Sequence, residues 1–248
     1  MSAGNQKGAE AIYGWKARIG LLLPSLNTVT EPEFNAMIPE GVSVHTARLL
    51  LRLPLSSEGL REMAKDTEKA AQTLASAGVK LISFACTSGS LVNGFGGDQE
   101  IIRHIERLTD IQATTTSTAV IAAFKKLGVR NVAVGTPYNE EVNQAEKSFF
   151  EAHGIKVVSM KGLDIHGEEL ASTSPEVTYD LACEVNTPGA HAVFISCMGF
   201  KSITVIERLE GNLNKYVFSS NTATMWDILK RLGIQDQPKG YGKLFSTI

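Results

Sequence analysis

Two cysteines end similar segments of the chain and could act as a catalytic pair. Cys86 closes the segment LISFAC, and Cys197 closes the segment AVFISC. A cysteine thiolate can remove a proton from carbon or attack carbon directly, and a second thiol can donate a proton from the opposite side. Two thiols that face one substrate can therefore invert or isomerise it without a cofactor.

Other interpretations of the three cysteines are less specific. Most buried cysteines are small, inert apolar residues, and Cys183, which follows Ala182 inside a predicted helix, fits that description. The odd number of cysteines argues against a disulfide framework, and a Cys86–Cys197 disulfide is not expected in a reducing cell. The sequence has no CxxC motif and no histidine cluster, so we predict no metal site.

Composition narrows the classes of function. The 248 residues include 24 basic and 26 acidic side chains, and 43% are apolar. This composition is typical of a globular protein, and the sequence contains no run of basic residues that would bind nucleic acid. Apolar runs such as residues 19–23 are far shorter than the about 20 residues of a membrane span. The first 16 residues lack the apolar core of a signal peptide, so we expect a flexible leader, a cytoplasmic location and no membrane partner.

The chain alternates predicted strands with predicted helices. Residues 17–24 (ARIGLLLP) are almost all apolar, which is typical of a strand buried on both faces of a parallel sheet. Thr30 and Glu33 have the spacing of a capping box, and apolar residues repeat at helical spacing from Leu60 to Leu74. The predicted strands cover residues 17–24, 42–51, 80–85, 112–115, 131–135, 156–160, 192–196 and 216–219.

Cap residues mark the starts of several later helices. Asp98 and Asn139 are expected as N-caps, and Ser174 is followed by a proline at the first helical position. The predicted helices in this part of the chain cover residues 101–108, 117–127, 142–152, 175–185, 203–209 and 222–232.

The order of elements indicates an internal duplication. Residues 117–129 (STAVIAAFKKLGV) and 222–234 (TATMWDILKRLGI) both place a basic pair before Leu-Gly and a β-branched residue. Alternating strands and helices imply a parallel sheet in each half. We therefore predict an α/β fold with two pseudo-symmetric flavodoxin-like halves, each a four-stranded parallel sheet flanked by helices, and an active site between them. The expected divisions are a leader (1–16), a first half (17–118), a second half (119–225) and a C-terminal helix and tail (226–248) packing back on the first half.

The loops after the strands should form the site, because ligands of open α/β sheets bind beyond the carboxyl ends of the strands. These loops carry thiols, hydroxyls, amides and a phenol but almost no charge, which suits a small anion held by backbone N–H groups, hydroxyls and helix N-termini. Helix N-termini also lower thiol pKa values, so we expect both cysteines to be acidic. Asn27 could instead form only an Asx-turn, and Tyr138 could be an ordinary core or surface residue. The candidate substrate-binding residues are Ser25, Asn27, Thr87, Ser88, Thr116, Ser117, Tyr138, Met198 and Gly199.

At these residues the sequence resembles the aspartate/glutamate racemase superfamily, in the branch of maleate cis-trans isomerases and arylmalonate decarboxylases. The resemblance covers residues 18–245. It is carried by PSLNT (24–28), ACTSGS (85–90), TTTSTAV (114–120), GTPYNEEVN (135–143), SCMG (196–199) and GYGKLF (240–245).

The resemblance implies cofactor-independent chemistry on a small dicarboxylate. It implies that Cys86 is the nucleophile that attacks a double bond and that Cys197 is the proton donor. It also implies that Asn27 and Tyr138 hold carboxylates and that Thr87 and Ser88 donate hydrogen bonds to one of them. In the decarboxylases of this branch a glycine takes the place of the first cysteine, so Cys86 favours isomerase or racemase chemistry.

One segment departs from the isomerase pattern. Residues 162–169 (GLDIHGEE) lack the second substrate-binding asparagine of maleate isomerases and resemble the decarboxylases more closely. The sequence therefore leaves open a decarboxylase of arylmalonate type, a racemase of a small carboxylic acid, and a non-catalytic carboxylate-binding module. It assigns no role to His166, and it leaves a homo-oligomer open without indicating an interface.

Overall fold

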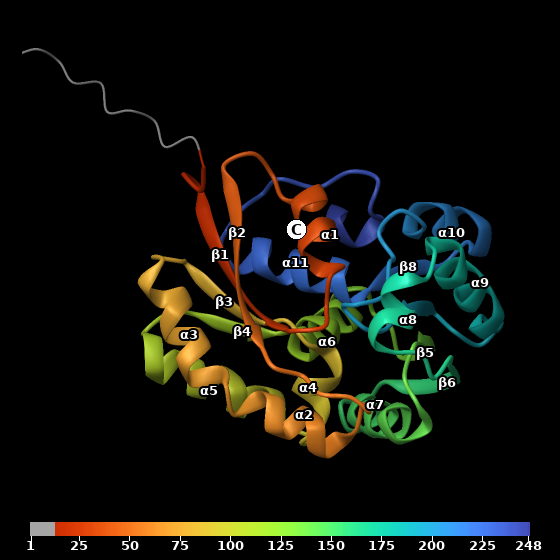
Figure 1. The fold of residues 1–248 in the computed structure, drawn as a ribbon. Helices are drawn as coiled ribbons and strands as arrows, with labels where there is room; N and C mark the ends of the chain where they lie inside the picture. The colour runs from red at the N-terminus through yellow and green to blue at the C-terminus, as the bar shows by residue number, and fades with distance from the viewer. Residues whose placement is uncertain (1–12) are drawn as a thin grey trace, which may run out of the picture.

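The computed structural model describes residues 13–248 and contains two four-stranded parallel sheets (Figure 1). Most of the predicted leader lies outside the described residues. The sheets have the orders β2-β1-β3-β4 and β6-β5-β7-β8, so the α/β fold with two similar halves is confirmed. The strands are β1 (Ala17–Pro24), β2 (Val42–Leu49), β3 (Leu81–Phe84), β4 (Ala113–Thr115), β5 (Asn131–Thr136), β6 (Lys156–Gly162), β7 (Ala192–Ile195) and β8 (Tyr216–Ser219).

Strand β1 lies inside the first sheet because its side chains are apolar on both faces. Ile19, Leu21, Leu22 and Leu23 have no exposed surface. β1 pairs in parallel with β2 on one side and β3 on the other, and β5 pairs in the same way with β6 and β7. Since every pairing is parallel, the carboxyl ends of the strands lie together at one edge of each sheet.

The helices differ from the prediction at three places. The helix expected from Leu60 to Leu74 is broken at Lys65 and Asp66 into two helices. Two short helices that the sequence analysis did not predict follow Cys86 and His166. The helices are α1 (Thr30–Met37), α2 (Ser57–Ala64), α3 (Thr67–Ser76), α4 (Thr87–Leu91), α5 (Gly97–Thr109), α6 (Thr116–Lys126), α7 (Glu140–Ala152), α8 (Gly167–Ser172), α9 (Pro175–Val185), α10 (Ile206–Leu213) and α11 (Ser220–Arg231), with a 3₁₀ turn at Lys243–Thr247. None of the helices within residues 13–248 is long and apolar enough to cross a membrane.

Two of the predicted helix caps are wrong, and two are confirmed in position: Asn139, and Ser174 with the proline that follows it. Thr30 and Glu33 do not form a capping box, because both side chains bond to the second half of the chain instead. Asp98 is not the N-cap of α5, which is preceded by Gly96 in a left-handed conformation with φ of 85°. Asn139 is the N-cap of α7, and its side chain accepts a hydrogen bond from a backbone N–H of the first turn at 3.1 Å.

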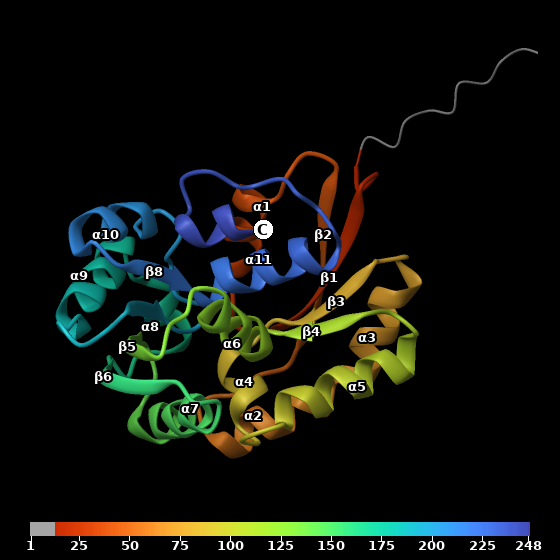
Figure 2. The same ribbon diagram turned by 180° about the vertical axis from the view of Figure 1, so that it is seen from behind.

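The two halves share one apolar core. Helices α6 and α11, which follow the fourth strands of the two halves, pack against each other in the middle of the molecule (Figure 2). The centroid of the Phe124 ring of α6 lies 5.7 Å from Phe194 and 5.2 Å from Phe218 of the second sheet, and 5.3 Å from Phe150 of α7. Such edge-to-face contacts contribute about 0.5–1.5 kcal/mol beyond the area they bury. Because α6 continues directly from β4 of the first sheet, packing around Phe124 links the two sheets.

Replacing Phe124 with alanine should destabilise both halves together. Deleting a buried phenylalanine costs about 3–5 kcal/mol, so the free energy of unfolding measured in urea should fall by about that amount in a single transition. The exposed neighbour Lys125 gives the matched control, because Lys125→Ala should change this free energy by less than about 0.5 kcal/mol. Two separate transitions, or equal losses in both variants, would contradict a shared core.

Candidate active site

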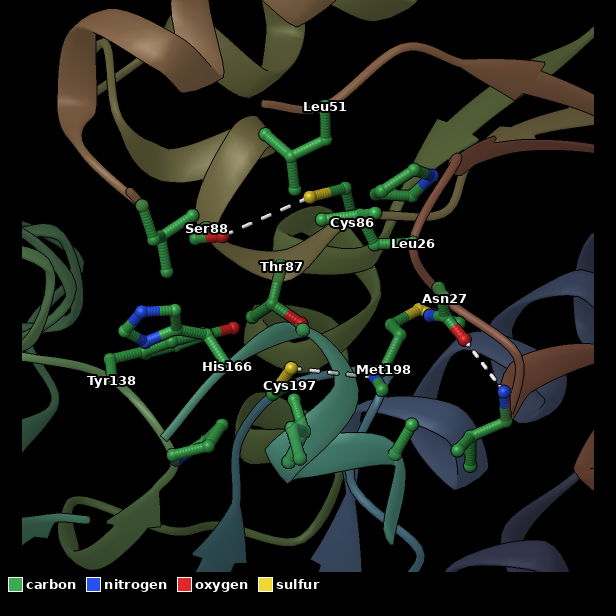
Figure 3. Close-up of a pocket in the computed structure, with 18 of the residues that line it drawn as sticks. Leu26, Asn27, Leu51, Cys86, Thr87, Ser88, Tyr138, His166, Cys197 and Met198 are labelled. Atoms are coloured by element: carbon green, nitrogen blue, oxygen red, sulfur yellow. Dashed lines mark hydrogen bonds between the residues drawn. The ribbon is translucent and has the colours of Figure 1, made fainter. Parts of the chain in front are cut away.

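Both predicted catalytic cysteines line one cavity that loops of the two halves build together (Figure 3). The cavity has about 80 Å³ of free volume, several times the about 10–15 Å³ that a single water needs. It lies beyond the carboxyl ends of β1, β3, β5 and β7. Eight of the candidate residues line it: Asn27, Cys86, Thr87, Ser88, Tyr138, Cys197, Met198 and Gly199.

Cys86 is the N-cap residue of α4. Its Sγ accepts a hydrogen bond from the Gly89 N–H at 3.3 Å, and the Ser88 Oγ lies 3.8 Å away. Burial raises the pKa of the Cys86 thiol, and these two neighbours lower it. A Cβ at residue 89 would stand only 3.0 Å from the sulfur, so a glycine there leaves room for the N–H to approach the thiol.

Cys197 has a backbone conformation that side chains rarely adopt. Its φ of 87° is left-handed, which costs about 1–3 kcal/mol outside glycine and is often found at functional sites. Its Sγ accepts a hydrogen bond from the Gly199 N–H at 3.4 Å. Burial raises the pKa of the Cys197 thiol to about 12, while the Gly199 N–H and the Tyr138 hydroxyl lower it. The predicted acidity of both thiols is therefore wrong, because burial outweighs the donors.

A single hydroxyl joins the two cysteine loops. The Ser220 Oγ accepts hydrogen bonds from the Thr87 Oγ1 at 2.8 Å and from the Cys197 N–H at 3.1 Å. Thr87 directly follows Cys86 in the first half, whereas Ser220 opens α11 in the second half. This hydroxyl therefore fixes the position of one thiol-bearing loop relative to the other.

Asn27 lines the cavity and also forms hydrogen bonds with the residues that begin α1. Its Oδ1 accepts hydrogen bonds from the Val29 and Thr30 N–H groups at 2.9 and 3.0 Å, and its Nδ2 donates to Thr30 Oγ1 at 2.9 Å. The Asx-turn considered from the sequence is therefore present. Thr30 Oγ1 donates in turn to the Met198 carbonyl at 2.9 Å, and the Arg48 guanidinium donates to the Asn27 carbonyl. The Asn27 amide is thus tied to the loop of the second cysteine.

Glu33, for which the sequence suggested only a capping role, holds the loop that follows Cys197. Its buried carboxylate accepts hydrogen bonds from the N–H groups of Ser202 and Ile203 at 2.6 and 3.2 Å and from the Asn221 Nδ2 at 2.5 Å. Burial raises the pKa of the carboxyl group, and these donors lower it. The acid crosses from α1 to the second half, which helical periodicity could not reveal.

Tyr138 follows β5 and is buried against the cavity. Its backbone N–H donates to Thr136 Oγ1 at 3.0 Å. The pKa of its hydroxyl is raised well above 10, mainly by burial and then by the charges that Cys197 and Glu146 can carry. Tyr138 is therefore a neutral phenol at physiological pH, placed beside the second thiol.

The remaining three candidates lie outside the cavity and support it from behind. Ser25 Oγ accepts the Leu51 N–H at 3.0 Å and so shapes a loop. Thr116 is sealed in the core, with its hydroxyl 2.8 Å from the sulfur of Met198. Ser117 Oγ lies 2.7 Å from Ser90 Oγ. The predicted order of strands correctly placed these residues at the same edge of the sheets. It could not predict the direction in which each side chain points.

One wall of the cavity, which the sequence analysis did not predict, is apolar. Leu51, Leu53 and Leu55 extend from the end of β2, and Ile165 and Leu170 lie around the start of α8. Within residues 13–248 the lining includes His166 but no Asp, Glu, Lys or Arg side chain. The described residues also contain no cluster of three or more His, Cys, Asp or Glu that could hold a metal ion. The site therefore combines two thiols, neutral polar groups and an apolar wall.

Comparison with known proteins places the chain in one family. The family model for arylmalonate decarboxylase matches residues 19–245. A maleate isomerase of Alcaligenes faecalis is 24% identical over 93% of this chain and 97% of its own length. The arylmalonate decarboxylase of Bordetella bronchiseptica is 28% identical over 90% of this chain and 96% of its own length.

Solved structures agree with this placement. The maleate isomerase Iso of Pseudomonas putida S16 superposes with a TM-score of 0.88 at 25% identity, covering 93% of this chain and 98% of that one. A liganded double mutant of arylmalonate decarboxylase superposes with a TM-score of 0.86 at 26% identity, covering 94% and 100%. With a family model that spans nearly the whole chain and two sheets of matching architecture, this protein belongs to the arylmalonate decarboxylase family.

Proposed function

We propose that the protein is a cofactor-independent isomerase that acts on a small dicarboxylate, as maleate cis-trans isomerases do, through Cys86 and Cys197. The observation that carries this proposal is that the two thiols, one from each half, line the same cavity. A thiol alone on one wall could attack or reprotonate a substrate, but a pair can do both to adjacent carbons.

The proposed reaction begins with the Cys86 thiolate. Its sulfur forms a bond to one carbon of the double bond, and the electron pair of that double bond takes the proton of the Cys197 thiol at the adjacent carbon. The resulting single bond rotates. The Cys197 thiolate then takes the proton back, the double bond forms again in the other geometry, and the C–S bond to Cys86 breaks. Both sulfurs end in their starting states, so no cofactor or oxidant is consumed.

The surroundings of each sulfur suit these different roles. The Gly89 N–H and the Ser88 hydroxyl stand where they stabilise negative charge on Cys86. The Cys197 thiol, with its pKa raised to about 12 by burial, keeps its proton at neutral pH and is a suitable donor. Because of this raised pKa, the Cys197 thiolate formed after proton donation is a strong base, which favours return of the proton.

The carboxylates of the substrate are assigned to neutral donors. Asn27 and Tyr138 hold them, and Thr87 and Ser88 contribute donors to one of them. An Asn amide nitrogen has two hydrogens, and the bond to Thr30 Oγ1 uses one of them. Dipoles that point into a buried site can bind an anion without a full positive charge.

Relatives of this chain support the choice of reaction. Four of the curated relatives are maleate isomerases, including those of Geobacillus stearothermophilus and Nocardia farcinica. One structural neighbour is a cysteine-to-serine mutant of the Nocardia farcinica maleate isomerase that carries a covalently bound succinylcysteine intermediate. An adduct of this kind is the species that the first proposed step would form on Cys86.

A second candidate function is decarboxylation of an arylmalonate-type diacid. The specific observation in its favour is the apolar wall of Leu51, Leu53, Leu55, Ile165 and Leu170, which could hold an aryl or alkyl group that maleate lacks. Cys197 alone would then return a proton to the carbon that loses carbon dioxide, and Cys86 would have no required role. A racemase would use the same two thiols to exchange an α-hydrogen.

Removing either active-site thiol should abolish isomerisation. Cys86→Ala and Cys197→Ala should each lower kcat for maleate by about a thousandfold or more, as expected when a nucleophile or acid is lost. Cys183→Ala is the matched control and should keep near wild-type activity, because Cys183 lies outside the cavity. Proton NMR of fumarate formation measures all three rates, and full activity in either single variant rules out a mechanism with two thiols.

The nature of the products separates the candidate reactions. In deuterium oxide, maleate should give fumarate without release of carbon dioxide, because the cycle only moves and returns a proton. An arylmalonate that loses carbon dioxide and gains deuterium at the α-carbon, with maleate unchanged, would instead assign the chain to decarboxylation. Exchange of an α-hydrogen in a chiral monocarboxylate, without either of these reactions, would assign it to racemisation. Binding without any turnover would leave only the carboxylate-binding module.

A further inference from the structure

A carboxyl group that the proposed reaction does not use lies directly behind Cys197. Glu146 projects from α7 and has no exposed surface. Its Oε1 accepts a hydrogen bond from the Ser196 Oγ at 2.6 Å, and Ser196 is the residue before Cys197. Its Oε2 is sealed from solvent and has no hydrogen-bond partner among the described residues. A fully buried carboxyl group with one unpartnered oxygen is unusual and needs a physical explanation.

The surroundings of Glu146 disfavour a negative charge. A buried carboxylate without a paired cation and with one unpartnered oxygen has a large desolvation cost, so the group keeps its proton instead. The ion pairs within residues 13–248 do not include Glu146. Burial raises its pKa to about 8, although the Ser196 hydroxyl lowers it. Glu146 is thus mostly neutral at pH 7 and becomes ionised in the alkaline range.

The groups that respond to this charge belong to the second half of the site. Ionised Glu146 raises the pKa of both Tyr138 and Cys197, whereas the pKa of Cys86 is raised by burial and lowered by the Gly89 N–H and the Ser88 hydroxyl. Helix α7 packs against β6 and α4. The charged residues of β6, Lys156 and Lys161, are exposed, and α4 contains no charged residue. Tyr138 and Cys197 are therefore the titratable groups that face Glu146.

We propose that Glu146 is a positioning residue for Cys197, which as a neutral acid anchors Ser196 behind the thiol and which on ionisation suppresses proton exchange by that thiol. Release of the Glu146 proton to solvent leaves a carboxylate within the same buried region as the sulfur. The Cys197 thiolate that the proposed cycle needs then becomes harder to form, because two negative charges would share a medium of low dielectric. Cys86, whose thiol is set by burial and by its neighbours Gly89 and Ser88, should not respond to this charge.

This proposal rests on the proposed role of Cys197, but alkylation of the thiols tests it without turnover. Iodoacetamide reacts with the thiolate, and peptide mass spectrometry follows Cys197 and Cys86 separately. For Glu146→Gln, the rate at Cys197 should equal that of the wild type at about pH 6.5 and exceed it by about three- to tenfold at about pH 9.5, which corresponds to about 0.5–1 pKa units. The rate at Cys86 should not change at either pH.

Two further variants separate ionisation from packing. Glu151→Gln changes an exposed carboxyl of the same helix and should match the wild type at both pH values. Glu146→Leu removes the ionisable group without introducing unpartnered amide hydrogens, and it should show the same alkaline rise as Glu146→Gln. A ratio to wild type that is the same at both pH values, or an equal change at Cys86, would overturn the proposal.

Thermal unfolding provides a second readout that does not depend on thiol chemistry. The folded state holds the Glu146 proton more tightly than the unfolded chain does, because its pKa is raised from 4.5 to about 8. The contribution of this group to stability is therefore complete below about pH 4.5 and is lost as the pH rises through about 8. The Tm of Glu146→Leu relative to wild type should increase from about pH 5 to about pH 9. A constant difference would show that the carboxyl group does not titrate in this range and would also overturn the proposal.

Discussion

The hydroxyl of Ser220 accepts hydrogen bonds from both loops that carry the active-site thiols, and the geometry of the cavity depends on this contact. Thr87 donates from the first half and the Cys197 N–H donates from the second, at 2.8 and 3.1 Å. Thr30 and Glu33 add bonds from α1 to the residues that follow Cys197. Because the halves also share a core around α6 and α11, the loops that carry the two sulfurs are joined by continuous packing and hydrogen bonds.

The second constraint is that the site is built almost without charge. Burial raises the pKa values of both thiols and of Tyr138. It also raises the pKa values of the carboxyl groups of Glu33 and Glu146. A dicarboxylate that enters such a cavity brings its own negative charge into a region of neutral dipoles. Ionisation of Glu146 would add a further negative charge near the bound dicarboxylate. The same ionisation that suppresses proton exchange by Cys197 would therefore also weaken binding of an anionic substrate.

Much of this arrangement could be predicted from the sequence, because it follows from chain order. The similar segments that end at Cys86 and Cys197, together with alternating strands and helices, are sufficient to predict two parallel sheets with thiols at the ends of their third strands. Contacts between the halves could not be predicted, since no local pattern encodes the partners of Glu33 or Ser220. Glu146 did leave a signal, because it falls between Val142 and Phe150 on the apolar face of α7, where an unpaired acid is unusual.

Cys86 and Cys197, which line the same cavity, should face each other across one substrate-sized space. A reagent with two alkylating carbons separated by a few atoms tests this most directly, because it can bridge only thiols that share such a space. Peptide mapping after limited treatment should recover the Cys86 and Cys197 peptides joined by one reagent molecule, with Cys183 excluded from any bridge. Recovery of both cysteines modified singly, with no bridged peptide at any reagent concentration, would contradict the account.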